Sequence, residues 1–294
     1  MTVDKQLVRK AFDKAATTYD ANAVLQREIA DRMLERLAYI KHQPRVVLDA
    51  GTGTGYGAQH LRTRYPDTAI VALDLAEAML KIARPPTSLW QKLRGTAPFH
   101  AVCGDIDQLP LKTNSVDMIW SSLALQWCND LNVSFAELYR VLAPNGLLMF
   151  ATFGPDTLKE LRSAFAEVDG YTHVNEFVDM HDIGDVLVSA GFNTPVMDME
   201  YITLTYADLK TMLYELKGIG AHNVTAGRNA GLMGKARWAA LVDAFERRRK
   251  DGRLPATYEV IYGHAWVNQK NRTQDGYQIV QMNIQRRRSE QGLL

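Results

Sequence analysis

Apolar residues recur with two different periods along this chain of 294 residues, and these periods predict alternating helices and strands. Near the N-terminus, apolar positions three or four residues apart indicate amphipathic helices over residues 3–17 and 22–40. Short, uninterrupted apolar runs then predict five buried strands, which begin at Val46 or cover residues 69–73, 99–103, 116–121 and 146–153. The helical patterns between these runs favour βαβ units and a parallel sheet.

The second half of the chain completes this sheet. Residues 155–168 and 179–190 have helical patterns, and Gly191 is expected to stop the second of these helices. Residues 195–205 and 256–267 alternate as strands do, and they would be the last two strands. We therefore predict an α/β fold with a doubly wound, seven-stranded, mostly parallel sheet.

A long insertion separates the last two predicted strands. It covers residues 206–255, where two helical patterns flank a stretch of small residues. A loop this long in a compact domain usually has a role, so we expect a lid or a substrate platform; a tolerated surface insertion is the alternative. Residues 85–98 form a second, shorter loop insertion. The predicted parts are a helical cap (1–43), an α/β core (44–205), a substrate-covering insertion (206–255) and the last strand with the tail (256–294).

The first strand leads into Asp49 and a loop that contains Gly51, Gly53 and Gly55, a pattern that allows a ligand to lie against a tight backbone turn. A dinucleotide site is one hypothesis, because Gly53, Gly55 and Ala58 have the G-x-G-x-x-A spacing. Asp49 argues against it, since a carboxylate would repel a pyrophosphate. The same carboxylate would suit S-adenosylmethionine (SAM), which carries an ammonium and a sulfonium group and no phosphate. The loop therefore predicts a SAM site.

Two further acids follow the next predicted strands. Asp74 is placed to hold ribose hydroxyls, and Asp105 to accept a hydrogen bond from an adenine amino group while Ile106 packs on the ring. We expect Leu75 and Ser122 in the same pocket. A lone Asp after a strand is more often a turn or capping residue. Three acids at these intervals around a glycine loop instead indicate a ligand site at the carboxyl edge of the sheet.

Composition narrows the class of protein only a little. A formal net charge of +1 predicts no general attraction to nucleic acid or to an anionic membrane. The two cysteines, Cys103 and Cys128, cannot form a disulfide framework, and we expect no metal. No window approaches about 18 uninterrupted apolar residues, so we expect a cytoplasmic protein without a membrane span.

Several longer motifs make the chain similar to one family. The general motifs over residues 45–153 resemble the class I SAM-dependent methyltransferases, whose fold is Rossmann-like. More narrowly, the chain resembles the malonyl-acyl-carrier-protein O-methyltransferases, which open biotin synthesis. The narrower resemblance is carried by F-D-K-A-A-T-T-Y-D (12–20), D-Q-L-P-L (107–111), S-V-D-M-I-W-S-S-L-A-L-Q-W-C (115–128), T-F-G-P-D-T-L-K-E-L (152–161), L-K-G-I-G-A (216–221) and T-Y-E-V-I-Y-G-H-A-W (257–266).

The resemblance implies an acceptor and a reaction. The acceptor would be the free carboxylate of a malonyl thioester on the phosphopantetheine arm of acyl-carrier protein, with malonyl-CoA as an alternative carrier. A carboxylate is already ionised at pH 7, so we expect no general base, no nucleophile and no metal. Methylation of another small acid or a quinone precursor stays open, as does a SAM-binding assembly factor. An NAD-dependent oxidoreductase rests on the glycine spacing alone.

A desolvated carboxylate needs a cation or several hydrogen-bond donors. Arg228 in the insertion is the leading candidate, and His222 and Lys217 are alternatives; a solvated loop charge is the other interpretation of Arg228. Tyr19 could cover the cofactor with its ring towards the sulfonium, or simply pack. Gln126 and Trp127 are expected to face the reaction centre, although Trp127 could equally belong to the core.

Basic residues near the end of the insertion suggest a docking site for the acidic carrier protein. We predict the patch from Arg247, Arg248, Arg249 and Lys250, with Arg253 close by. A second run, at residues 286–288, lies near the C-terminus, farther from the insertion. Runs of charge are often only solvated surface, and nucleic acid is another conceivable ligand for such a run.

Overall fold

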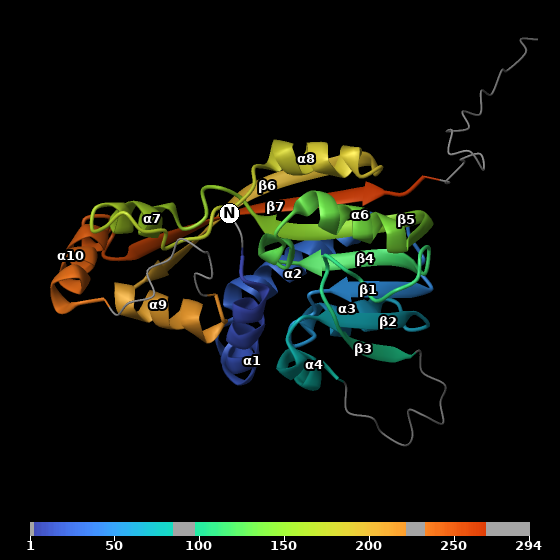
Figure 1. Ribbon diagram of the computed structural model, residues 1–294, viewed down its shortest axis with the longest axis horizontal. Helices are drawn as coiled ribbons and strands as arrows, with labels where there is room; N and C mark the ends of the chain where they lie inside the picture. The colour runs from blue at the N-terminus through green and yellow to red at the C-terminus, as the bar shows by residue number, and fades with distance from the viewer. Residues whose placement is uncertain (1–2, 85–97, 222–232, 269–294) are drawn as a thin grey trace, which may run out of the picture.

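The computed structural model describes residues 3–84, 98–221 and 233–268, and their strands form one seven-stranded sheet in the order β3-β2-β1-β4-β5-β7-β6 (Figure 1). All neighbouring strands pair in parallel except β7, which is antiparallel to both β5 and β6. The strands are β1 (Val46–Ala50), β2 (Ala69–Asp74), β3 (Phe99–Cys103), β4 (Val116–Ser122), β5 (Leu142–Phe153), β6 (Asn193–Tyr206) and β7 (Leu254–Trp266). The predicted sheet is therefore confirmed.

Helices cover both faces of this sheet (Figure 1). Helices α2 (Val24–Leu37) and α3 (Tyr56–Arg64) pack on one face, and α6 (Leu131–Val141) and α8 (Met180–Ser189) pack on the other. Burial on both faces explains why the parallel strands are continuously apolar in sequence. Gly191 follows α8 with a φ of 97°, so the predicted stop is also confirmed. No helix among the described residues is long and apolar enough to cross a membrane.

Helix α1 (Lys5–Asn22) lies across the carboxyl end of the sheet, between α4 (Glu77–Ala83) and α9 (Leu209–Gly218). Asp4 begins the helix by accepting hydrogen bonds from the backbone N–H groups of Gln6 and Leu7. The helix continues five residues beyond the predicted end at Thr17. Tyr19 therefore lies inside the helix, one face of which packs towards the core.

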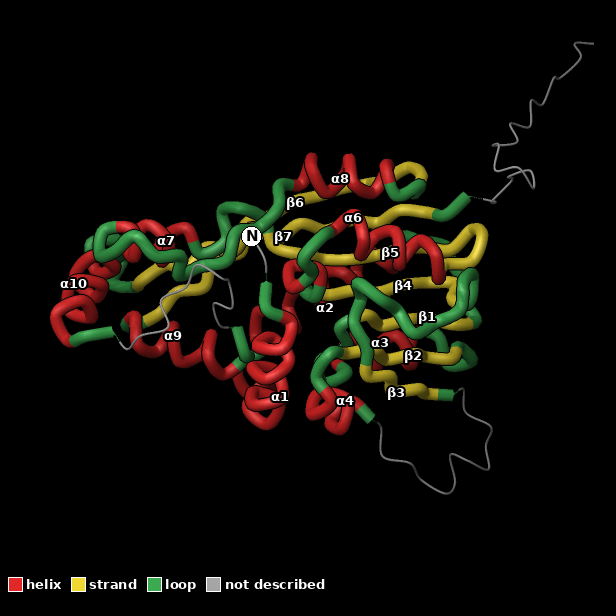
Figure 2. Tube along the Cα trace, viewed as in Figure 1, coloured by secondary structure: helices red, strands yellow, loops and turns green. Residues whose placement is uncertain are grey.

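The last two strands extend beyond the rest of the sheet. Strand β7 pairs with β6 along its whole length, but with β5 only from Val260 to Trp266. The remaining part of β6 and β7 is a two-stranded ribbon, which carries α7 (Lys159–Ala166), α9 and α10 (Lys235–Glu246) (Figure 2). We call this ribbon and its three helices the lobe. The two helices predicted in the insertion are α9 and α10, and they share the lobe with α7, which precedes the insertion.

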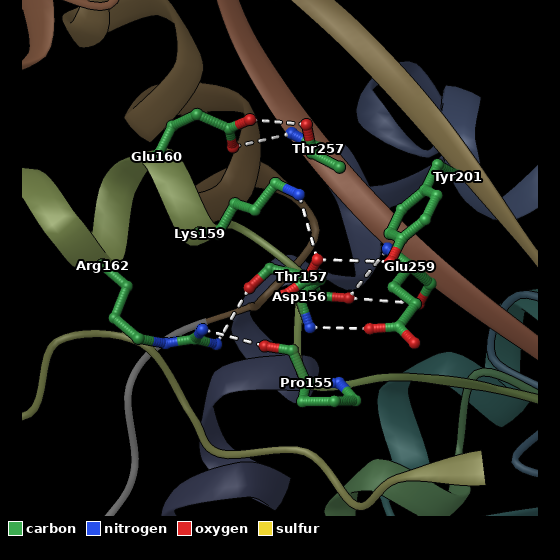
Figure 3. Close-up of polar contacts among 9 residues, drawn as sticks. All are labelled: Pro155, Asp156, Thr157, Lys159, Glu160, Arg162, Tyr201, Thr257 and Glu259. Carbon is green, nitrogen blue, oxygen red and sulfur yellow. Dashed lines mark hydrogen bonds and ion pairs between the residues drawn. The ribbon is translucent and has the colours of Figure 1, made fainter.

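A buried carboxylate holds the chain where β7 leaves β5 (Figure 3). Glu259 of β7 is only 6% exposed, and its Oε2 accepts a hydrogen bond of 2.7 Å from the backbone N–H of Asp156. Its backbone C=O accepts from the N–H of Gly154, and a Cβ on Gly154 would lie 2.4 Å from the Glu259 Cδ. The segment after β5 is thus fixed to β7 before it can become helical. For this reason α7 begins at Lys159, later than the predicted residue 155.

Two further side chains extend this network, which we call the Glu259 clamp. Glu160 accepts hydrogen bonds from the backbone N–H and the hydroxyl of Thr257, at 3.0 and 2.5 Å. Arg162 donates to the carbonyl oxygens of Pro155 and Thr157, at 2.8 and 3.0 Å (Figure 3). The clamp therefore joins two motifs that lie about a hundred residues apart in the sequence.

Removing the Glu259 carboxylate should destabilise the protein. In Glu259→Ala the half-buried N–H of Asp156 loses its acceptor, and we expect the free energy of unfolding to fall by about 1–3 kcal/mol. Urea denaturation followed by circular dichroism measures this change. Glu259→Gln keeps an acceptor and should lose less, and Glu35→Ala, at an exposed helical position, is the matched control. Equal stability of Glu259→Ala and the wild type would contradict the role of the clamp.

Candidate cofactor and substrate site

The glycine loop forms a tight turn between β1 and α3. Gly51, Gly53 and Gly55 all have positive φ angles, at 83°, 54° and 89°. The backbone N–H groups of Gly51 and Thr52 donate to the Leu73 carbonyl oxygen, at 2.8 and 2.9 Å, and so attach the turn to β2. A Cβ on Gly51 would lie 2.2 Å from the Cβ of Ala124. Conformation and close packing together require glycine at this position.

A pocket of about 80 Å³ opens beside this turn, and we call it the loop pocket. Among its lining residues are the predicted ones at the carboxyl ends of β1 to β4, namely Gly51, Gly53, Asp74, Leu75, Asp105, Ile106 and Ser122. The Asp74 carboxylate is fixed by hydrogen bonds from the backbone N–H groups of Gly53 and Ala76, at 2.9 and 2.8 Å. The structure therefore brings the predicted residues of four separate strands into one pocket.

Lys5 is a residue of this pocket that the sequence did not indicate. Its Nζ lies 2.8 Å from Asp105 Oδ1 and 2.9 Å from Asp107 Oδ2. Because Lys5 is at the first position of α1, these ion pairs hold the N-terminal helix over the loop pocket. One oxygen of Asp105, Oδ1, is thus already bound to Lys5. The predicted hydrogen bond from an adenine amino group would have to use the other oxygen or share this one.

A second pocket, of about 50 Å³, lies on the inner side of the turn, and we call it the inner pocket. Asp49 lines it and is only 2% exposed, with a hydrogen bond of 2.7 Å from the Thr52 hydroxyl. Burial raises the pKa of Asp49 to about 7, and the negative charge of Asp74 adds to the shift. Burial also raises the pKa of Asp74 to about 6. Within the described residues, neither carboxylate forms an ion pair with a lysine or arginine. A cationic ligand would therefore stabilise the charged form of both carboxylates.

The inner pocket also contains two donors that the sequence did not single out. Arg27 lines the pocket from α2, and its Nη1 donates to the Asp20 carbonyl oxygen. Trp120 lines it from β4, and its buried indole N–H has no hydrogen-bond partner within the described part of the chain. Arg27 belongs to no quoted motif, and Trp120, although it lies within the 115–128 motif, reads as part of the apolar run of β4, so neither position points to a ligand by itself.

A much larger cavity, of about 320 Å³, separates the lobe from the sheet, and we call it the lobe cavity. Its wall is mostly apolar. Its lining residues are Phe12, Tyr19, Gln26, Leu123, Gln126, Trp127, Phe153, Thr157, Leu158, Leu161, Phe165, His173, Val174, Asn175, Phe177, Leu213, Leu216, Lys217, Ile219, Ala221 and Tyr258. Thr157 and Tyr258 belong to the two segments that the Glu259 clamp joins, so the clamp also fixes part of the cavity wall.

Five residues line both this cavity and one of the smaller pockets. Phe12, Leu123 and Trp127 are shared with the loop pocket, and Gln26 is shared with the inner pocket. Tyr19 lines all three, so the three hollows meet at its side chain. Burial raises the pKa of the Tyr19 hydroxyl, with smaller contributions from the charges of Asp74 and Asp20, so this hydroxyl stays a hydrogen-bond donor.

The structure divides the predicted substrate residues into two groups. Tyr19, Gln126, Trp127 and Lys217 all line the lobe cavity. Trp127 packs edge-on against Phe12, with ring centroids 5.4 Å apart, so it belongs both to the cavity wall and to the packing under α1. His222 and Arg228 lie outside the described residues.

Three polar residues of the lobe cavity were missed by the sequence analysis. His173 stacks on Phe165, with ring centroids 3.7 Å apart, and its Nε2 lies 2.8 Å from Asp169 Oδ1. The side-chain oxygens of Asn175 and Gln26 are buried and have no hydrogen-bond partner among the described residues. No local pattern marks these positions, because only the packing of α2 and of the segment after α7 around the cavity brings them to it.

The predicted docking arginines make contacts within the lobe. Arg247 and Arg248 both form ion pairs with Glu167, which follows α7. Arg249 pairs with Glu246 at 2.7 Å and donates to the carbonyl oxygens of Ala207 and Gly252. These three side chains therefore fasten the end of α10, and their charge is largely neutralised within the molecule. Lys250 and Arg253 pair with each other through their backbones, and residues 286–288 lie outside the described part of the chain.

Comparisons with known proteins agree with this geometry. A family model described as "Methyltransferase domain" matches residues 48–150, which contain the glycine loop and the acids. A solved structure of a candidate methyltransferase from Bacillus halodurans superposes with a TM-score of 0.57 at 20% identity, covering 82% of this chain and 99% of that one. The YcgJ protein of Bacillus subtilis superposes with a TM-score of 0.55 at 15% identity, covering 81% and 98%. The fold is that of a class I methyltransferase.

Curated relatives narrow the class to one family. The malonyl-acyl-carrier-protein O-methyltransferase of Gallionella capsiferriformans is 58% identical over 95% of this chain and 96% of its own length. The protein of the same name from Laribacter hongkongensis is 57% identical over 95% of both chains. This chain belongs to the malonyl-acyl-carrier-protein O-methyltransferase family, as the sequence motifs predicted. Membership of this family removes the dehydrogenase alternative.

The unpaired Asp49 should reduce the stability of the ligand-free fold at neutral pH. Its folded pKa of about 7 exceeds the unfolded value of about 3.9, so the folded state binds more protons, and stability falls as the pH rises from about 4 to 7. We expect Asp49→Asn to raise the free energy of unfolding at pH 8 by at least about 1 kcal/mol, and by less at pH 5.

Urea denaturation of the ligand-free protein at the two pH values measures this effect. Asp67→Asn changes an exposed acid in the turn between α3 and β2 and is the matched control, with no expected gain. An Asp49→Asn protein that is no more stable than the wild type at pH 8 would show that the Asp49 carboxylate does not destabilise the ligand-free fold.

Proposed function

We propose that this protein transfers the methyl group of SAM to the free carboxylate of a malonyl thioester carried by acyl-carrier protein, the reaction that opens biotin synthesis. The observation that carries the proposal is the junction at Tyr19, where two pockets meet a large apolar cavity. One pocket contains Asp74 and the other Asp49, and neither acid forms an ion pair with a described lysine or arginine. The names of the relatives support the choice of acceptor. Malonyl-CoA is a smaller acceptor with the same reacting group.

The residues of the two small pockets fit SAM. Asp74 would hold the ribose hydroxyls, and Ile106 and Leu75 would cover the adenine in the loop pocket. In the inner pocket, Asp49 would offset the positive charge of the ammonium and sulfonium groups. Arg27 and the unpartnered N–H of Trp120 would bind the carboxylate of the methionine part. When bound, SAM supplies a methyl group that is already activated by its sulfonium.

The residues at the junction suit an acceptor that needs no activation. A carboxylate is ionised at pH 7, and methylation of its oxygen releases no proton, so no general base is required. Tyr19 lines all three hollows and Gln26 lines two of them, so we assign the positioning of the carboxylate to the Tyr19 hydroxyl and the Gln26 amide. Neutral donors would hold the oxygen without neutralising its charge. The apolar wall of the lobe cavity would exclude water from the in-line transfer.

Transfer of labelled methyl from SAM to malonyl-carrier protein tests the function directly. We expect label on malonyl-carrier protein and none on acetyl-carrier protein, which lacks the free carboxylate. In the same assay, Gln26→Leu should lower kcat about tenfold or more, because a charged acceptor loses a hydrogen bond. The effect on the dissociation constant for SAM, whose pocket Gln26 also lines, should be smaller. Label on neither acceptor, with SAM bound, would refute the proposed acceptor.

The role of Arg27 can be separated from the rest of the SAM site. Arg27→Gln should raise the dissociation constant for SAM about tenfold or more, because a carboxylate loses its charged partner. Methylthioadenosine has no carboxylate, and its affinity should not change. Isothermal titration with both ligands measures the difference. Equal losses for the two ligands would indicate that Arg27 supports the pocket without contacting the carboxylate.

A further inference from the structure

The outer face of α9 carries a row of side chains without partners. Lys210, Tyr214 and Lys217 are spaced four and three residues apart, so they lie on one side of the helix. Tyr214 is 72% exposed, and both lysines are exposed, with no ion pair to any described residue. The other side of α9 packs into the lobe and lines the lobe cavity through Leu213 and Leu216. Lys217 both lines this cavity and is exposed, so it lies at the cavity mouth.

Helix α1 continues this surface. The Thr18 hydroxyl donates to the Gly218 carbonyl oxygen at 3.0 Å, and a Cβ on Gly220 would lie 3.2 Å from a ring carbon of Phe12. The end of α9 thus lies against α1, as Figure 1 also shows. Lys14 and Lys10 are exposed one and two turns before Thr18, on the same side of α1. They too form no ion pair with any residue that the structure describes.

The acids nearest to these lysines in sequence have other partners. Asp208, two residues before Lys210, accepts from the backbone N–H and the hydroxyl of Thr211, at 2.8 and 2.9 Å, and the charge of Lys210 contributes to lowering its pKa. Asp13 accepts from the backbone N–H of Ala78 and lies 3.8 Å from Arg9. Glu215 accepts from the Tyr206 hydroxyl at 2.9 Å. Lys10, Lys14 and Lys217 therefore keep a positive charge that none of these acids cancels, and the charge of Lys210 is offset only in part by Asp208. The arginines at the end of α10 form ion pairs instead.

We infer that the surface formed by Lys10, Lys14, Lys210, Tyr214 and Lys217, which we call the α9–α1 surface, is where the acidic carrier protein docks. The inference rests on the proposed function, since it assigns a partner to that same site. Unpaired lysines complement an acidic partner and speed its encounter, and an exposed tyrosine among them is a typical interface anchor. The thioester arm would enter the lobe cavity past Lys217, whose ammonium group would meet the phosphodiester of the arm.

The test compares two double variants with the same change in net charge. Lys14→Glu/Lys210→Glu reverses charge on both helices of the surface but leaves the cavity-lining Lys217 in place. Lys41→Glu/Lys112→Glu, at exposed loop positions before β1 and β4, is the matched control. Steady-state methyl transfer is measured with malonyl-carrier protein and with malonyl-pantetheine, and carrier-protein binding is measured by titration.

At low ionic strength, we expect the first variant to raise KM and the dissociation constant for carrier protein about tenfold or more. High salt should shrink the difference. Its kinetics with malonyl-pantetheine and its affinity for SAM should match the wild type, and the control variant should behave as the wild type throughout.

Other outcomes overturn the inference. Unchanged carrier-protein binding would place docking elsewhere, and equal losses with both acceptors would mean that the lysines support the cavity. A preference for nucleic acid or anionic vesicles over carrier protein would assign the surface to another partner. If the wild type methylates neither acceptor, the proposed function fails by itself, and the titration still decides whether carrier protein binds this surface.

Discussion

The pairing of β7 sets the architecture of this molecule. Because β7 pairs with β5 over only half its length and with β6 over all of it, the sheet ends in a two-stranded ribbon that projects beyond the core. A ribbon of two strands is not stable alone, so helices must cover it. Helices α7, α9 and α10 do so, and the lobe cavity is the space that remains between them and the sheet. The Glu259 clamp fixes the point at which the ribbon departs.

Two buried acids in the site destabilise the ligand-free fold, and a cationic ligand would offset their charge. Asp49 and Asp74 are buried beside the glycine loop without a partner cation among the described residues, although burial raises both pKa values. Lys5, by contrast, forms ion pairs with Asp105, which lines the loop pocket, and with Asp107, and these pairs hold α1 in place. The positive groups of a bound methyl donor would therefore supply the charge that Asp49 and Asp74 lack. Asp105 and Asp107 instead hold α1 over the site through Lys5.

A run of basic residues in a sequence does not by itself predict a positively charged surface in the folded protein. Arg247, Arg248 and Arg249 are consecutive, yet the fold places Glu167 and Glu246 against them. Lys14 and Lys210 lie about two hundred residues apart and attract no attention in the sequence. Because α9 crosses α1, they lie on adjoining helices that border one cavity mouth.

The sequence by itself determined the sheet, the glycine loop and the acids that follow its strands. These features depend on local rules: apolar periodicity, the conformational freedom of glycine, and the common edge at which parallel strands end. The prediction of the reaction came from the motifs that the chain shares with its family. The tertiary structure alone decided which side chains meet at Tyr19, that Lys5 engages Asp105, and that Gln26, Arg27, His173 and Asn175 reach the pockets. Those contacts join segments that are distant in the chain, and their geometry depends on how whole helices pack, which no local pattern encodes.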